Sequence, residues 1–406
     1  MNFKNLLVIL IGIFLNQSSV IAGVNFSFSD IFLLIFILYL IINREKWINP
    51  KIITIILIII SYLLILNLII TPLIWKVEVS ILKILIEIIK LFLLFLYLLF
   101  GIYVTRKDYI DILLKAFMIS SIVISIYSLL LKIINLPFKE EMFYAGVRLR
   151  GFMNDPNIYG IFQVCALSIL INTNMSFLYK GIFFTTIIST IMLSGSKTSF
   201  ICLIVLLIIN IIKFVKITSY SNIMMLFGLL LLLIFLNIVY GSVLFSNFQT
   251  SFGRVYSLIF DTKSAISDGG SDRTKAWLTA LDIIFHSYFL GVGLGSYLII
   301  SKNNYDVEIL AHNTYLQLIA EWGAGLTILI SFYLLIKMIY LKLFFISKDK
   351  YILELMCYFL IGSLAISLNN SRLLWLIIGW LVIKKSSSND NSKRKESVKF
   401  KVFNNN

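Results

Sequence analysis

Residues 52–71 read IITIILIIISYLLILNLIIT and carry no charged side chain. A helix that crosses a bilayer core of about 30 Å needs about 20 apolar residues, whereas barrel strands alternate over about ten. Similar runs recur along the 406 residues, of which 60% are hydrophobic and 14% charged. A soluble domain would be about half apolar and a quarter charged. The sequence therefore predicts an all-α integral membrane protein and excludes soluble enzymes, disordered proteins and disulfide-stapled secreted folds.

The apolar runs predict twelve transmembrane helices with both termini in the cytoplasm. The expected spans are 6–23, 27–43, 52–71, 84–104, 109–134, 158–174, 178–195, 198–215, 223–244, 323–344, 351–369 and 372–384. In this topology 20 basic residues lie in cytoplasmic segments and 12 in outer segments, as the positive-inside rule requires. A cleaved signal peptide is the alternative for the first span, because Lys4 precedes an apolar run that ends in small residues near Ala22.

Residues 1–385 are expected to form one polytopic membrane domain and residues 386–406 a basic, disordered cytoplasmic tail. Two polar loops, 136–157 and 245–311, fall on the outer side. Within the second, residues 273–289 place Trp277, Leu281, Ile284 and Phe285 at helical spacing, which indicates an amphipathic helix at the membrane surface. We interpret the net charge of +15 as topology-setting charge and expect no nucleic-acid partner.

The first candidate for chemistry is the segment RLRGFMNDPN at residues 148–157. Arg148 and Arg150 present forked, permanently charged donors that can clamp a phosphate. Asp155 and Pro156 are suited to turn the chain and cap the next helix. The alternative is a solvated loop whose arginines contact lipid headgroups.

The second candidate is SGSKTS at residues 194–199, between two predicted spans. It lacks the spacing of a Walker phosphate loop and faces away from cytoplasmic ATP, so we reject nucleotide binding. Lys197 at the outer end of a helix pair is placed to meet an anionic lipid carrier, with simple snorkelling to the interface as the alternative.

The chain contains two histidines, and only one of them lies where chemistry is expected. His286 falls within the amphipathic stretch and is interpreted as structural. His312 lies where an outer loop enters a helix, beside Asn313 and nine residues before Glu321. An imidazole titrates near neutral pH, so His312 is suited to take a proton from an attacking hydroxyl, although a structural role remains the alternative.

Three further patterns are given structural interpretations. Gly291, Gly293 and Gly295 mimic part of a dinucleotide fingerprint, but no strand precedes them, so we expect a flexible turn. Glu87 lies between Lys83 and Lys90 at helical spacing and is expected to form a self-neutralising group. The three cysteines and the acidic residues of the outer loop have no metal-ligand spacing, so no metal or cofactor is expected.

The order of these motifs resembles the O-antigen polymerase and O-antigen ligase family of membrane glycosyltransferases. The resemblance covers residues 148–326 and rests on the Arg-x-Arg-Gly segment, the Ser-x-Ser-Lys segment, Arg273-x-x-x-Trp277, the glycine run, and His312-Asn313 followed by Glu321. It implies a GT-C-like helical fold and a metal-independent reaction. It also implies that Arg148, Arg150, Lys197 and Arg273 bind the substrate diphosphate, that His312 activates the acceptor hydroxyl, and that Asn313 and Glu321 support it.

The family often has arginine where this chain has Lys197, which keeps the charge but loses the bidentate geometry. The resemblance further implies a substrate linked to undecaprenyl diphosphate at the outer face of the plasma (inner) membrane. We therefore expect a polymerase that joins repeat units of an O-antigen, as in lipopolysaccharide, or of a capsule. The alternatives are an O-antigen ligase that transfers polymer to lipid A core and, from another class, a flippase for lipid-linked sugars. Membrane lipids and a chain-length regulator protein are the other expected partners.

Overall fold

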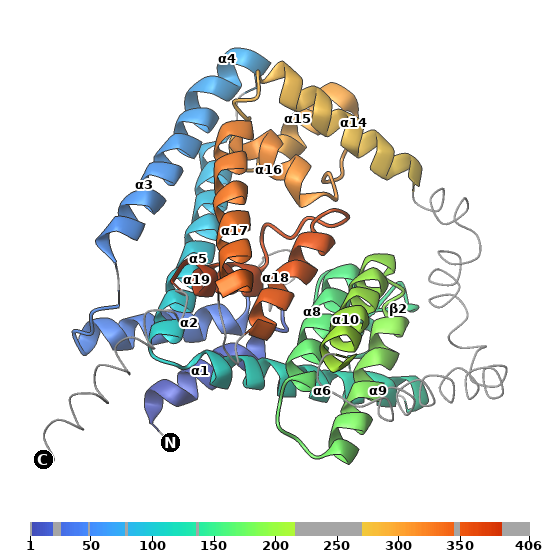
Figure 1. The fold of residues 1–406 in the computed structure, drawn as a ribbon. Helices are drawn as coiled ribbons and strands as arrows, with labels where there is room; N and C mark the ends of the chain where they lie inside the picture. The colour runs from blue at the N-terminus through green and yellow to red at the C-terminus, as the bar shows by residue number, and fades with distance from the viewer. Residues whose placement is uncertain are drawn as a thin grey trace, which may run out of the picture. The chain divides into compact units, whose positions relative to one another are not determined.

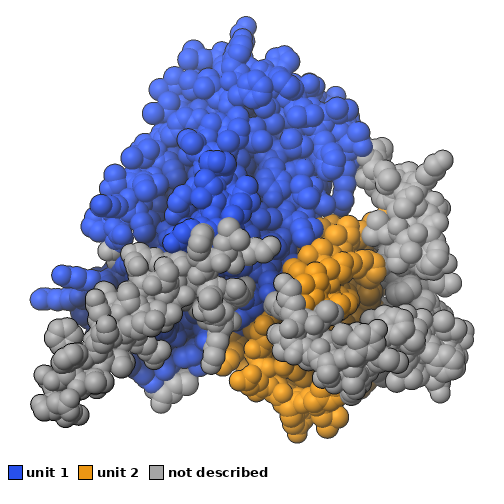
Figure 2. Space-filling model, in the orientation of Figure 1, with its two compact units in different colours: residues 1–11, 29–114, 272–406 blue, residues 12–28, 115–271 orange. Residues whose placement is uncertain are grey.

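The computed structural model describes residues 2–18, 26–47, 49–77, 80–134, 138–215, 270–344 and 350–383. The described chain is helical except for one small hairpin, in which β1 (Phe143–Tyr144) pairs antiparallel with β2 (Arg148–Leu149). It forms two compact units, coloured separately in Figure 2. Unit 1 comprises residues 1–11, 29–114 and 272–406, and unit 2 comprises residues 12–28 and 115–271.

The helices follow the predicted order of apolar runs (Figure 1). They are α1 (Phe3–Phe14), α2 (Phe28–Ile42), α3 (Pro50–Ile65), the π-helical η1 (Leu66–Ile70), α4 (Thr71–Trp75), α5 (Ile81–Arg106), α6 (Ile110–Ile133), α7 (Lys139–Met142), α8 (Pro156–Ile171), α9 (Phe177–Leu193), α10 (Lys197–Val215), α14 (Gly270–His286), α15 (Ser296–Tyr305), α16 (Thr314–Trp322), α17 (Ala324–Phe344), α18 (Lys350–Gly362) and α19 (Arg372–Ile383).

Four of the described helical segments have the length and composition to cross a membrane: Pro50–Trp75, Ile81–Arg106, Ile110–Leu131 and Ala324–Leu341. Seven other apolar helices are shorter. The described chain is thus mostly helical with four candidate membrane-spanning helices, which is consistent with the predicted all-α membrane protein, whereas twelve spans and a GT-C-like arrangement stay predictions. The first helix ends at Phe14 rather than continuing through the predicted span 6–23. The predicted span 223–244 and the tail 386–406 lie outside the described residues.

Unit 1 is held by close helix packing and by one buried ion pair. Gly101 of α5 and Gly379 of α19 meet backbone to backbone, because a Cβ on either glycine would collide with a carbonyl oxygen of the other helix. Arg372 donates from Nε and Nη2 to the two carboxylate oxygens of Asp30, at 2.7 Å each, and Tyr97 donates to the same carboxylate at 2.8 Å. Asp30 lies in the first turn of α2, and its buried carboxylate is the centre of this cluster.

Candidate functional site

The two arginines of the 148–157 segment have different surroundings within unit 2. Arg148 on β2 donates from Nε to the carbonyl of Ser194 at 2.9 Å and from Nη2 to Oδ1 of Asn157 at 2.9 Å. Arg150 donates from Nε to the carbonyl of Glu141 at 2.8 Å, within the same hairpin. These hydrogen bonds connect Arg148 to the SGSKTS segment, whereas the hydrogen bond of Arg150 stays within its own hairpin.

The start of α8 is built as the sequence predicted. Asp155 accepts a hydrogen bond from the backbone N–H of Asn157 at 2.6 Å, and Pro156 occupies the first turn, where its missing N–H costs nothing. This cap orients the Asn157 side chain that receives Arg148. The capping role expected for Asp155 and Pro156 is therefore confirmed.

Lys197 is the first residue of α10 and follows a tight serine turn. The Ser199 hydroxyl lies 2.8 Å from that of Ser196 and donates to the carbonyl of Asn157 at 3.2 Å. Because Arg148 contacts both Ser194 and Asn157, the first and second sequence candidates form one polar cluster at the ends of α8, α9 and α10. Two basic residues belong to these segments, Arg148 on β2 and Lys197 at the start of α10.

In unit 1 the predicted amphipathic helix is present as α14, which carries Arg273, an exposed residue, near its start. One face packs against α15 and α16 through a core that includes Ala280, Ile283 and Ile284. Of the four apolar residues at helical spacing, Ile284 therefore belongs to the buried core. The stripe left on the surface consists of Trp277, Leu281 and Phe285, which are 39–59% exposed.

The glycine run forms the expected turn, which lies between α14 and α15 and is hydrogen-bonded to neighbouring elements. Val292 and Gly293 donate their backbone N–H groups to carbonyls of α16 at 2.8 Å, and the Thr71 hydroxyl donates to the Val292 carbonyl at 2.5 Å. All three glycines have φ between 69° and 92°. A Cβ on Gly293 would collide with the Asn67 side chain, so glycine is required both by conformation and by space.

His312 and Asn313 form the entry to α16. Asn313 is the N-cap, and its side chain accepts from the backbone N–H groups of Tyr315 and Leu316 at 3.0 and 3.1 Å. His312 is half-buried and has a φ of 47°, which is in the left-handed region. Thr314, the first residue of α16, donates its backbone N–H to the Ser363 carbonyl and its hydroxyl to the Ile366 carbonyl. The histidine turn is therefore attached to the α18–α19 loop, residues 363–371.

The contacts of His286 agree with the structural role expected for it. Its Nδ1 lies 3.1 Å from the Asp282 carbonyl one helical turn back, and its ring lies 5.7 Å from that of Trp75.

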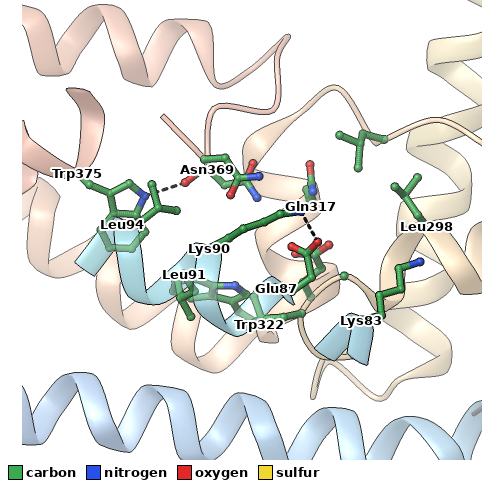
Figure 3. A pocket seen from close by; sticks show the side chains of 15 residues that line it. Lys83, Glu87, Lys90, Leu91, Leu94, Leu298, Gln317, Trp322, Asn369 and Trp375 are labelled. Carbon is green, nitrogen blue, oxygen red and sulfur yellow. Dashed lines mark hydrogen bonds and ion pairs between the residues drawn. The ribbon is translucent and has the colours of Figure 1, made fainter. Parts of the chain in front are cut away.

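A cavity of about 210 Å³ lies within unit 1, among α5, α15, α16, α19 and the α18–α19 loop (Figure 3). Glu87 and Lys90 form an ion pair of 2.7 Å in its wall, as expected from their spacing. Figure 3 shows Trp375 and Asn369 at one end and Lys83 and Leu298 at the other, with Glu87 and Gln317 between them. No local sequence pattern indicates this cavity, because its residues come from segments up to about 290 positions apart.

Glu321 lines the same cavity and is 5% exposed. Burial, with a smaller contribution from the nearby Glu87 carboxylate, raises the pKa of Glu321 to about 8, although hydrogen bonds from Gln317 and from the Gly295 backbone oppose the shift. Glu321 is therefore mainly protonated and neutral at pH 7, and a neutral carboxyl can donate as well as accept a hydrogen bond.

The predicted site residues are thus divided between the two units. Unit 2 holds Arg148, Arg150 and Lys197, and unit 1 holds Arg273, His312, Asn313 and Glu321. Sequence reasoning missed Asn157 as a partner of Arg148, and it missed the cavity residues Gln317, Asn369 and Trp375. For Asn157 and Asn369, the available signal was the presence of a polar side chain beside a predicted apolar helix.

The fold and these polar sites define a helical membrane protein whose charged and titratable groups cluster at helix ends. A family model described as O-antigen ligase matches residues 182–331. The resemblance to the O-antigen polymerase and ligase family is confirmed by this match, which supports a membrane glycosyltransferase that uses lipid-linked glycans. No curated protein and no solved structure matches the chain.

Proposed function

We propose that this protein is a polymerase that joins oligosaccharide repeat units carried on undecaprenyl diphosphate into an O-antigen or capsular polysaccharide. The observation that carries the proposal is the O-antigen ligase match, whose span includes Lys197, Arg273, His312 and Glu321. Arg148 precedes the matched span, but it is bonded to the segment that carries Lys197. In this proposal the reaction takes place at the outer face of the plasma membrane, and both termini are cytoplasmic. A chain-length regulator is a proposed partner.

In the proposed reaction His312 takes the proton of an acceptor hydroxyl while its oxygen forms a bond to the anomeric carbon of the donor. The bond from that carbon to the diphosphate oxygen breaks, and undecaprenyl diphosphate leaves with the electron pair. We assign Arg148, Arg150, Lys197 and Arg273 to the negative charge of the diphosphate, because fixed cations stabilise charge that grows in the transition state. One in-line displacement inverts the anomeric centre, so a product with retained configuration would contradict this mechanism.

An O-antigen ligase is the second candidate, since the description of the matching family model names that activity. It would use the same donor and differ in its acceptor, lipid A core. A flippase is the candidate of another class, and it would move the lipid-linked unit without forming a glycosidic bond.

Deletion of the gene, followed by electrophoresis of the surface polysaccharide, separates the three activities. A polymerase deletion leaves single repeat units on their anchor. Loss of surface polymer with long chains still on the lipid carrier would indicate a ligase, and single units trapped on the cytoplasmic side would indicate a flippase.

Complementation with His312→Ala tests the chemistry, and His286→Ala is the matched control in the same unit. We expect His312→Ala to reproduce the deletion phenotype at a normal protein level, while His286→Ala restores the ladder. Long chains in the His312→Ala strain would remove His312 as the base.

A further inference from the structure

We propose that the cavity of unit 1 is a subsite for one neutral sugar ring of the lipid-linked glycan. The inference rests on the proposed function, because it names the part of the substrate that this cavity recognises. Its volume of about 210 Å³ suits a single ring.

The first argument is a buried hydrogen-bond acceptor that lines the cavity. The side chain of Gln317 is 4% exposed, and within the described part of the chain no group donates to its Oε1. Its hydrogen bond to Glu321 uses the other end of the amide. A buried acceptor without a donor destabilises the empty protein, so a ligand that brings a donor is favoured.

The second argument concerns which ligand can supply that donor. A sugar hydroxyl both donates and accepts, whereas a diphosphate near neutral pH offers almost only acceptors. The Lys90 ammonium is already paired with Glu87, so part of the positive charge in the wall is neutralised. The amides of Asn369 and Asn370 add donors and acceptors in the same wall, which suits hydroxyl groups.

The third argument is the apolar surface of the cavity. The rings of Trp322 and Trp375 lie 6.3 Å apart between centroids, and both residues line the cavity. The Trp375 indole donates from Nε1 to the Asn369 carbonyl at 2.7 Å, which fixes its orientation (Figure 3). Flat aromatic faces combined with a few fixed polar groups are typical of small-molecule sites, and the C–H face of a pyranose fits such a surface.

Two segments that line the cavity are connected to the histidine turn of unit 1. Leu310, two residues before His312, belongs to its wall. The loop that supplies Asn369 and Asn370 is bonded to Thr314, two residues after His312. A sugar ring held here would therefore lie close to the turn that carries the histidine.

The test uses the purified full chain and two probes, the lipid-linked repeat unit extracted from the deletion strain and undecaprenyl diphosphate without sugar. A ligand that binds the folded state raises the melting temperature. We expect the glycan-bearing lipid to raise it more than the sugar-free lipid, and we expect this difference to vanish in Gln317→Leu and Asn370→Leu. Asn304→Leu, which changes another exposed asparagine of unit 1 outside the cavity, should retain the difference.

Gln317→Leu removes the unpartnered Oε1 acceptor together with the amide hydrogen bond to Glu321, so Asn370→Leu serves as the second variant, which leaves that hydrogen bond in place. In a polymerisation assay both cavity variants should raise KM about 2- to 10-fold, as expected for one lost hydrogen bond. A difference between the two lipids that persists in both variants, or that is absent from the wild type, would overturn the subsite. A wild-type protein that shows the difference but makes no polymer would refute the proposed polymerase and leave the sugar site standing.

Discussion

The buried ion pair between Asp30 and Arg372 gives the strongest stability prediction. Asp30 is fully buried and the Arg372 side chain is 7% exposed, and two 2.7 Å hydrogen bonds join them. Asp30→Asn keeps the size of the side chain but leaves the guanidinium without a counter-charge. Breaking a buried pair from one side costs about 3–5 kcal/mol, a factor of roughly 100 to 5,000 in the unfolding equilibrium constant.

The double variant Asp30→Leu with Arg372→Met separates charge burial from packing. Replacing both partners of a buried pair by apolar residues is often neutral or stabilising, so this variant should recover most of the loss. The Tyr97 hydroxyl, which also bonds to Asp30, keeps Ser29 as a partner at 2.7 Å. The free energy of unfolding is measured by reversible denaturation of the purified protein in mixed micelles.

Glu308→Gln is the matched control, because the Lys302–Glu308 pair has the same 2.7 Å distance but exposed side chains. It should leave the free energy of unfolding nearly unchanged, since exposed pairs contribute little. If Asp30→Asn were as stable as this control, or if the double variant were as unstable as the single one, the reasoning from charge burial would be refuted.

Three further predictions concern the candidate sites. Gly293→Ala should lower the melting temperature, because φ is 78° and the new Cβ would collide with Asn67; an unchanged melting temperature would contradict the tight turn. The pKa of Glu321 is raised to about 8 in the fold, so its stabilising contribution is complete below its ordinary pKa of 4.5 and is lost as the pH rises to about 8. Glu321→Gln should flatten that part of the stability profile, and a profile parallel to wild type would exclude Glu321 as its source. Arg148→Lys should shorten the polymer on gels more than Arg150→Lys, because Lys cannot keep both hydrogen bonds of the fork; equal effects would contradict the distinct role of Arg148.

Local patterns in the sequence were sufficient to predict most helices. Uncharged runs such as 52–71 predict their helices by length alone, and Asp155 followed by Pro156 predicts where α8 begins. The amphipathic stretch is a helix, as predicted, although its spacing did not distinguish a face covered by protein from one left exposed. Ile284 faces the protein, because α14 is covered on one side by α15 and α16, and no periodicity shows which of two apolar faces has a partner.

The contacts that build the candidate sites join residues far apart in the sequence. Asp30 and Arg372 are 342 positions apart, and Arg148 and Ser194 are 46 apart. A hydropathy profile shows Arg372 only as a charged residue at the end of an apolar run and does not predict that its side chain is buried. Such pairs depend on which helices lie side by side, and a single sequence carries no local signal for that.

The short helix α16 connects the two proposed activities of unit 1. His312 precedes its Asn313 cap, while Gln317 and Glu321 lie one and two turns along it in the cavity wall. A helix of nine residues rises about 13 Å, so the proposed sugar site and the proposed base would lie within the length of a short oligosaccharide. Because both act through one helix whose first turn is bonded to the α18–α19 loop, binding of a sugar against that loop would also fix the histidine turn. If both proposals hold, recognition of the repeat unit and the chemistry at its hydroxyl depend on the same element, and the buried Gln317 would then serve binding rather than stability.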